Sequence, residues 1–178
     1  MASNDKSRAV FVDRDGTIMR DADYCSDPKQ VEIFPGVPNA MRRLKAAGYK
    51  LIVITNQSGI GRGFFTLDQY HAVEAEVSRQ VEGLIDATYF CPDVPGQRSS
   101  CRKPEPGMVL QAARDHHVDL GRSFFVGDKE SDVQCGQNAD LRTVRVRTGL
   151  DRAVATSGAD WVVEDFAQAA ETILTCES

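Results

Sequence analysis

Short apolar runs rich in β-branched residues alternate with amphipathic stretches along most of this chain. The run from Ala9 to Val12 predicts a buried strand, and the run from Leu51 to Ile54 predicts a second. Between them, apolar residues from Val37 to Ala47 recur at helical spacing. Strands separated by helices form parallel sheets with right-handed crossovers. The alternation therefore predicts an α/β fold built on a three-layer, Rossmann-like parallel sheet.

The same alternation continues toward the carboxyl end. One helix is predicted from Thr66, which could cap it, to Gly83, and another from Pro106 at its first position to about His116. Further strands are predicted at Thr88 to Phe90, Ser123 to Val126, Leu141 to Val146 and Trp161 to Val163, with helices ending near Asn138 and Leu174. Residues 91–104 are expected to form one long loop. No insertion is long enough for a separate cap domain, so we expect residues 1–178 to form a single domain.

Composition narrows the class of protein. Of the 178 residues, 42% are hydrophobic and 26% are charged, a balance typical of globular chains and not of disordered ones. The net charge of −5 does not favour a protein that coats nucleic acid. No apolar run is long enough for a signal peptide or a membrane span. We expect a cytoplasmic monomer without nucleic-acid or membrane partners.

The chain has five cysteines, an odd number that is widely spread along the sequence. Such a set provides no even framework of disulfide bonds. In the reducing cytoplasm thiols stay unpaired. We therefore expect five reduced thiols.

Polar residues stand at four predicted strand ends. Asp13, Thr55 and Asp128 each come directly after or at the end of a strand, and Arg102 and Lys103 lie in the loop that follows another. In open α/β sheets, ligands bind at the carboxyl ends of the strands. The sequence therefore predicts that these side chains form one site.

Two carboxylates, Asp13 and Asp15, follow the first strand at a spacing of two residues. An ionised aspartate needs no base to activate it, so it could attack phosphorus directly and form an aspartyl phosphate. Two unit charges 4 Å apart interact by about 4 kcal/mol at an effective dielectric near 20, so an anionic substrate would be repelled. Lys103, a hydrogen bond from Thr55 and a Mg²⁺ ion at Asp128 could offset that repulsion.

Four motifs in this order resemble the haloacid dehalogenase superfamily: D-x-D-G-T, T-N after a strand, R-K-P and G-D-K-x-x-D. The longer strings FVDRDGT, ITNQSGIGRG, CRKPEPGM and VGDKESD are similar to the D-glycero-D-manno-heptose 1,7-bisphosphate 7-phosphatase family within it. The similarity covers nearly the whole chain. It implies a Mg²⁺-dependent phosphatase that removes the 7-phosphate of a small sugar bisphosphate through an aspartyl phosphate.

The resemblance also implies roles for individual residues. Asp13 would be the nucleophile, and Asp15 would protonate the leaving oxygen and then deprotonate the attacking water. Thr55 and Lys103 would hold the transferring phosphoryl group. Mg²⁺ would be bound by the carboxylates of Asp13 and Asp128 and by the backbone carbonyl of Asp15. The substrate site would be lined by Asp21, Ala22, Asp23, Tyr24, Asn56, Gln57, Ser58, Arg102 and Lys129.

The chain departs from the family at its zinc loop. The family commonly has C-x-H and C-x-C before R-K-P, whereas this chain has Cys91 and Asp93, then Ser99 and Cys101. Structural zinc normally takes four nitrogen or sulfur ligands in a closed tetrahedron. Two of the four ligands are replaced here, so we expect no zinc.

Other functions are possible for such motifs. Histidinol-phosphate phosphatase is similar in its motifs and zinc loop, but the strings N-Q-S-G-x-x-R-G and D-K-x-x-D favour the heptose enzyme. A non-catalytic phosphosugar-binding protein would not need every catalytic position filled. The glycines at 59, 61 and 63 follow a strand, but they lack the spacing of a dinucleotide-binding loop. A phosphatase acting on a small sugar phosphate remains the leading hypothesis.

Overall fold

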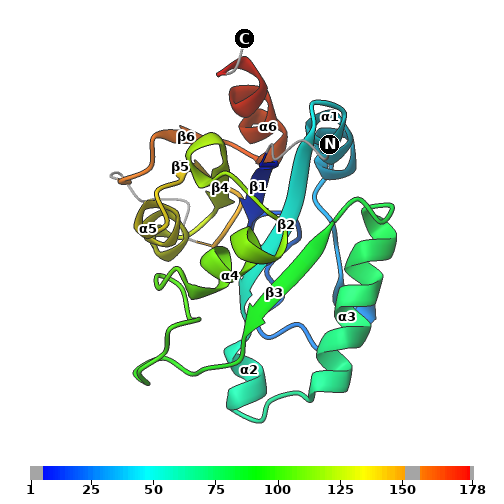
Figure 1. The fold of residues 1–178 in the computed structure, drawn as a ribbon. Helices are drawn as coiled ribbons and strands as arrows, with labels where there is room; N and C mark the ends of the chain where they lie inside the picture. The colour runs from blue at the N-terminus through cyan, green and yellow to red at the C-terminus, as the bar shows by residue number, and fades with distance from the viewer. Residues whose placement is uncertain (1–5, 151–156, 177–178) are drawn as a thin grey trace.

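Six parallel strands form one sheet in the computed structural model, which describes residues 6–150 and 157–176 (Figure 1). The strands lie in the order β3-β2-β1-β4-β5-β6. Their bounds are β1 Arg8–Val12, β2 Tyr49–Asn56, β3 Ala87–Cys91, β4 Phe124–Gly127, β5 Arg142–Val146 and β6 Trp161–Val163. The winding of the chain reverses between β1 and β4, so the connections after these two strands diverge and leave a crevice.

Helices cover both faces of this sheet. Their bounds are α1 Val37–Ala46, α2 Ser58–Gly61, α3 Leu67–Gln80, α4 Gly107–Asp115, α5 Glu130–Asn138 and α6 Phe166–Thr175, with short 3₁₀ turns η1 Pro28–Gln30 and η2 Leu120–Arg122. One apolar cluster joins the sheet to α1, α3 and α6, and a second joins it to α4 and α5. The predicted three-layer α/β fold is confirmed.

Strand β1 illustrates why the sheet is buried on both sides. Val10 and Val12 belong to the first apolar cluster, whereas Ala9 and Phe11 belong to the second. Successive side chains of a strand point to opposite faces, so an uninterrupted apolar run serves both layers. Asp13 is the first residue after this run, and it therefore stands at the carboxyl edge of the sheet.

Several predicted element ends are wrong by a few residues. Helix α3 ends at Gln80 and does not reach Gly83, because Glu82 and Gly83 adopt positive φ angles of 59° and 68°. Pro106 is the residue before α4 and not its first helical position. Thr66 caps α3 as predicted, since its side chain accepts a hydrogen bond from the backbone N–H of Gln69. The short helix α2, which holds the glycines at 59 and 61, was not predicted as a helix.

The prediction of five reduced thiols is wrong for two of them. Cys91, at the end of β3, and Cys101 form a disulfide bond that closes part of the predicted long loop. The odd count concealed this pair, because the Cα atoms of the two residues lie 5.7 Å apart only once the loop has folded back. Cys25 and Cys135 are free and buried, and Cys176 is free and exposed. No helix in residues 6–150 and 157–176 is both long and apolar enough to cross a membrane.

Candidate active site

A polar cavity of about 340 Å³ lies at the carboxyl edge of the sheet, which is where the sequence pattern predicted a site. Asp13 after β1, Thr55 in β2 and Lys103 in the loop after β3 all line it. Asp128 follows β4 and stands beside Asp13. The structure thus brings together four groups, and the first and last of them, Asp13 and Asp128, are more than a hundred residues apart in the sequence.

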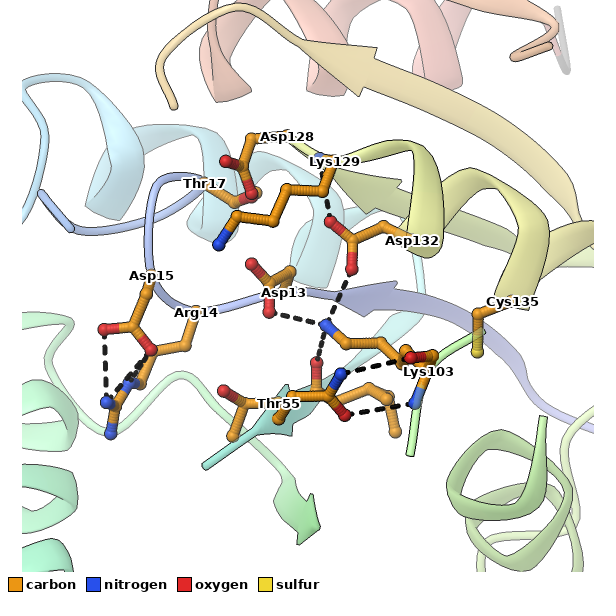
Figure 2. A network of polar contacts seen from close by, with 12 residues as sticks. Asp13, Arg14, Asp15, Thr17, Thr55, Lys103, Asp128, Lys129, Asp132 and Cys135 are labelled. Atoms are coloured by element: carbon orange, nitrogen blue, oxygen red, sulfur yellow. Dashed lines mark hydrogen bonds and ion pairs between the residues drawn. The ribbon is translucent and has the colours of Figure 1, made fainter. Parts of the chain in front are cut away.

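Lys103 is the buried cation at the centre of this site. Its Nζ donates to Asp13 Oδ1 at 2.6 Å and to the Ile54 carbonyl at 2.8 Å, and it lies 2.7 Å from Asp132 Oδ1 (Figure 2). Burial alone would lower the pKa of Lys103, but the carboxylates of Asp13 and Asp132 raise it above its ordinary value. All three protons of the ammonium group thus have an acceptor, and its charge is held at the floor of the cavity.

Asp132 is a site residue that the sequence motifs did not predict. It lies in the first turn of α5, where its Oδ2 accepts a hydrogen bond from the backbone N–H of Lys129 at 3.0 Å. Its other oxygen faces Lys103. The signal was present in the sequence, because the last acid of G-D-K-x-x-D falls at the third position of a helix that begins only two residues beyond the end of a strand.

Asn56 holds the backbone of Lys103 in place. The Asn56 side chain accepts a hydrogen bond from the Lys103 N–H at 3.1 Å and donates one to the Lys103 carbonyl at 3.2 Å. Because β2 carries Asn56, this pair fixes the loop after β3 against the neighbouring strand. Asn56 also lines the cavity.

Three buried carboxylates lie close together, and two of them, Asp13 and Asp132, line the cavity. Ligand oxygens of Asp13, Asp128 and Asp132 lie within 4.8 Å of one another. Burial, together with the charges of Asp13 and Asp132, raises the pKa of Asp128 to about 8. Burial likewise raises the pKa of Asp13, although Lys103 opposes that rise. Burial and mutual repulsion therefore oppose the ionisation of all three carboxylates together unless a cation compensates them.

This cluster fits a hard divalent cation. Asp128 Oδ2 is buried and has no hydrogen-bond partner among the described residues. Its Oδ1 accepts a bond of 3.4 Å from Thr17 Oγ1. A side chain at Gly16 or Gly149 would collide with the Asp128 carboxylate, so both glycines leave room for it. An unpaired oxygen beside two other carboxylates is a donor set that suits Mg²⁺.

The Asp15 carboxylate is turned away from Asp13 (Figure 2). Arg14 donates to both of its oxygens, and Gln57 Nε2 donates to Asp15 Oδ2 at 2.9 Å. The same Gln57 nitrogen donates to Thr55 Oγ1 at 2.9 Å. Since Thr55 Oγ1 accepts this bond, its hydroxyl proton can be donated to a bound group.

Most of the residues assigned to the substrate site by resemblance do line the cavity. They are Asp21, Asp23, Tyr24, Asn56, Gln57, Ser58, Arg102 and Lys129. Ala22 does not line it and packs instead against the first apolar cluster. Arg102 Nη1 donates to the carbonyl of Asp93 at 3.0 Å, which ties it to the long loop.

An aromatic pair stands near the cavity. The ring of Tyr24, a lining residue, meets the ring of Phe64 edge to face at 4.9 Å, and both side chains are exposed. The guanidinium carbon of Arg62 lies 6.0 Å from the Phe64 ring. Aromatic rings and a guanidinium group therefore lie side by side near the cavity.

The four positions of the altered zinc loop lie together. Ser99 Oγ accepts backbone hydrogen bonds from Cys101 at 3.2 Å and from Arg102 at 3.0 Å. The Sγ atoms of Cys91 and Cys101 and a carboxylate oxygen of Asp93 lie within 4.8 Å of one another. Zinc is bound by thiolates, and the disulfide removes both of them. The disulfide and a zinc site at this position exclude each other.

Comparisons with known proteins agree with this geometry. A family model described as HAD-hydrolase-like matches residues 100–169. The chain is 40% identical over 179 residues to D-glycero-beta-D-manno-heptose-1,7-bisphosphate 7-phosphatase of Escherichia coli strain K12, covering 93% of each chain. The same enzyme of Helicobacter pylori strain J99 is 40% identical over 140 residues, which is 76% of this chain and 80% of that one.

A solved structure is also similar over nearly its whole length. It is D,D-heptose 1,7-bisphosphate phosphatase from B. bronchiseptica, complexed with magnesium and phosphate. The TM-score is 0.87 at 32% sequence identity, and the match covers 96% of this chain and 99% of that one. The sheet described above is therefore shared with a phosphatase structure that contains a metal ion and a phosphate.

Proposed function

We propose that this chain, which belongs to the D-glycero-D-manno-heptose-1,7-bisphosphate 7-phosphatase family of HAD-like hydrolases, removes the 7-phosphate of D-glycero-D-manno-heptose 1,7-bisphosphate. The observation that carries the proposal is the buried pair of Asp13 and Lys103 at the base of a polar cavity. A carboxylate nucleophile needs an adjacent cation to approach a phosphate.

Asp13 is the nucleophile in this proposal. Its Oδ1 is bound to Lys103, so Oδ2 attacks phosphorus while the bond from phosphorus to the sugar oxygen breaks. Asp15 is ionised beside Arg14; when it turns toward the substrate it takes up a proton from solvent and gives that proton to the leaving oxygen. Asp15 then takes a proton from the water that attacks the aspartyl phosphate, which releases inorganic phosphate and regenerates Asp13.

Lys103 and Thr55 hold the transferring phosphoryl group. The Nζ of Lys103 is fixed by three acceptors, so its positive charge is already in place to attract the phosphoryl oxygens as negative charge develops on them. Thr55 donates its remaining hydroxyl proton to one of these oxygens. Arg102 and Lys129, both cationic lining residues, contact the rest of the anionic substrate.

Mg²⁺ is the proposed cofactor. Asp13, Asp128 and the backbone carbonyl of Asp15 would hold it, and the unpaired Asp128 Oδ2 supports that assignment. When bound, the ion supplies positive charge that offsets repulsion between the carboxylates and the phosphate.

The proposed enzyme is a cytoplasmic monomer whose residues 1–178 form one domain without a cap. In residues 6–150 and 157–176, loops rather than a second domain surround the cavity, among them the segments that carry Asp21 to Tyr24 and Arg102. A cavity surrounded by loops in this way suits a small soluble sugar phosphate.

Kinetics on two substrates test the assignment. The value of kcat/KM for the heptose bisphosphate should exceed that for histidinol phosphate by at least about a hundredfold, which corresponds to about 3 kcal/mol of transition-state binding. A single phosphate leaves the cationic groups beyond the catalytic centre unpaired. If histidinol phosphate were the better substrate, the heptose assignment would fail while the phosphatase assignment stood.

After purification in air, outside the reducing cytoplasm, the loop should contain the disulfide between Cys91 and Cys101 and no zinc. Denatured without reductant, the protein should expose the three thiols of Cys25, Cys135 and Cys176, and all five after reduction. Thiol titration and elemental analysis of the same sample measure both. Five thiols without reductant, together with about one zinc per chain, would instead assign Cys91, Asp93 and Cys101 as zinc ligands.

A further inference from the structure

Arg14 lies between the two aspartates of D-R-D-G-T and is almost completely buried, with 1% of its side chain exposed. Its Nε and Nη2 donate to the two oxygens of Asp15, each at 3.1 Å. Its Nη1 donates to Glu74 Oε1 at 2.5 Å. A buried cation is tolerated only where acidic partners compensate it, and here two carboxylates do so.

The fork of Arg14 determines where the Asp15 carboxylate points. Both Asp15 oxygens are engaged by Arg14, and Gln57 adds a third donor from the turn after β2. Asp15 nevertheless lines the cavity and has 18% of its side chain exposed. A planar guanidinium that binds a carboxylate through two parallel bonds fixes its plane as well as its position.

Glu74 keeps Arg14 in place from another part of the fold. It lies in α3, 60 residues away in the sequence, and 15% of its side chain is exposed. Burial alone would lower the pKa of Arg14, but Asp15 and Glu74 raise it above its ordinary value. Glu74 therefore leaves Arg14 with a negative partner even when Asp15 turns toward a substrate.

We propose that Arg14 is a positioning residue for Asp15. Glu74 supports Arg14 while the Asp15 side chain rotates toward the substrate. The inference rests on the acid–base role proposed above for Asp15. Arg14 sets the carboxylate at a defined place on the cavity wall, from which a rotation of the side chain brings it to the leaving oxygen or to water. Lysine at this position would keep the charge but lose the two-bond fork.

Pre-steady-state kinetics with p-nitrophenyl phosphate separate this role from a purely structural one. The nitrophenolate leaves without protonation, so formation of the aspartyl phosphate does not need Asp15, whereas its hydrolysis does. Arg14→Lys should release about one equivalent of nitrophenolate per active site in a fast phase and then turn over at least about tenfold more slowly than wild type. Because the slowed step follows the covalent intermediate, KM should fall together with kcat, and kcat/KM should change by less than about threefold.

Two further variants keep the test informative. Glu74→Gln removes the charge that supports Arg14 and leaves Asp15 unchanged. It should show the same fast phase and a smaller loss of steady-state turnover than Arg14→Lys. Glu76→Gln is the matched control, because Glu76 lies in the same helix and pairs with the exposed Arg79 at 2.6 Å. It should retain wild-type kinetics. The double variant Arg14→Lys with Asp15→Asn should be no slower than Asp15→Asn alone, because both changes disable the same group, the Asp15 carboxylate.

Three results would overturn the inference. They are unchanged turnover by Arg14→Lys, loss of the fast phase in a variant that still unfolds cooperatively, or additive losses in the double variant. The aryl phosphate makes the test independent of the heptose assignment. If Asp15→Asn itself retained wild-type turnover, the proposed acid–base role would fail first, which is a distinguishable result.

Discussion

Asp13→Asn is expected to lower kcat by more than about a hundredfold on every phosphate substrate, because an amide cannot attack phosphorus. The change is nearly isosteric and removes one negative charge from the cluster with Asp128 and Asp132. Lys103 keeps Asp132 as a partner 2.7 Å away. The thermal unfolding midpoint should therefore stay close to that of wild type.

The matched control is Asp115→Asn, which makes the same chemical change at an exposed position at the end of α4. It should leave kcat unchanged. Steady-state assays with an aryl phosphate and with the heptose bisphosphate measure both variants. Residual activity of Asp13→Asn above about a hundredth of wild type would contradict its assignment as the nucleophile.

Chelation of metal by EDTA is expected to lower turnover by more than about a hundredfold, and added Mg²⁺ should restore it. Asp128→Ala removes the carboxylate whose Oδ2 is buried without a partner among the described residues, and Mg²⁺ should not rescue this variant. The loss follows because the anionic nucleophile and the anionic substrate then repel each other without compensation.

Thermal unfolding gives a readout of the metal site that does not depend on activity. Mg²⁺ at a hundred times its Kd should stabilise the wild type by about 2.7 kcal/mol, or roughly 5 to 10 °C in Tm for a chain of this size. Asp128→Ala should lose most of that shift. Full activity in EDTA, or an undiminished Mg²⁺ shift in the variant, would contradict the proposed ligand set.

The fold could be predicted because its signal is local. Runs such as Ala9 to Val12 and Leu51 to Ile54 are apolar on both faces, which is the pattern of a buried parallel strand. Once the strands were placed, Asp13, Thr55 and Asp128 had to meet at one edge of the sheet. Their convergence needed no knowledge of side-chain distances.

The interactions that were missed join residues far apart in the chain. Arg14 meets Glu74 across 60 residues, and whether they touch depends on how α3 packs on the sheet. Lys103 meets Asp132 for a similar reason, since the loop after β3 and the start of α5 lie side by side only in the folded protein. Sequence patterns carry the period of a helix or strand, but not the distance between two of them.

Resemblance and geometry also differ for single residues. A motif assigns a continuous stretch such as 21–24 to the substrate site, but successive residues point in different directions. Asp21 and Tyr24 line the cavity, whereas Ala22 packs on the core. The disulfide between Cys91 and Cys101 was missed because counting cysteines ignores how a loop folds back.

Phosphorus NMR of the reaction with D-glycero-D-manno-heptose 1,7-bisphosphate tests the central claim most directly, since it reports which phosphate is removed. We expect the signal of the 7-phosphate to disappear as inorganic phosphate appears, while the signal coupled to the anomeric proton persists. Wild-type protein with Mg²⁺ should complete this conversion, and Asp13→Asn should leave both signals unchanged. Loss of the anomeric phosphate first, or no reaction of the bisphosphate under conditions where an aryl phosphate is hydrolysed, would contradict it.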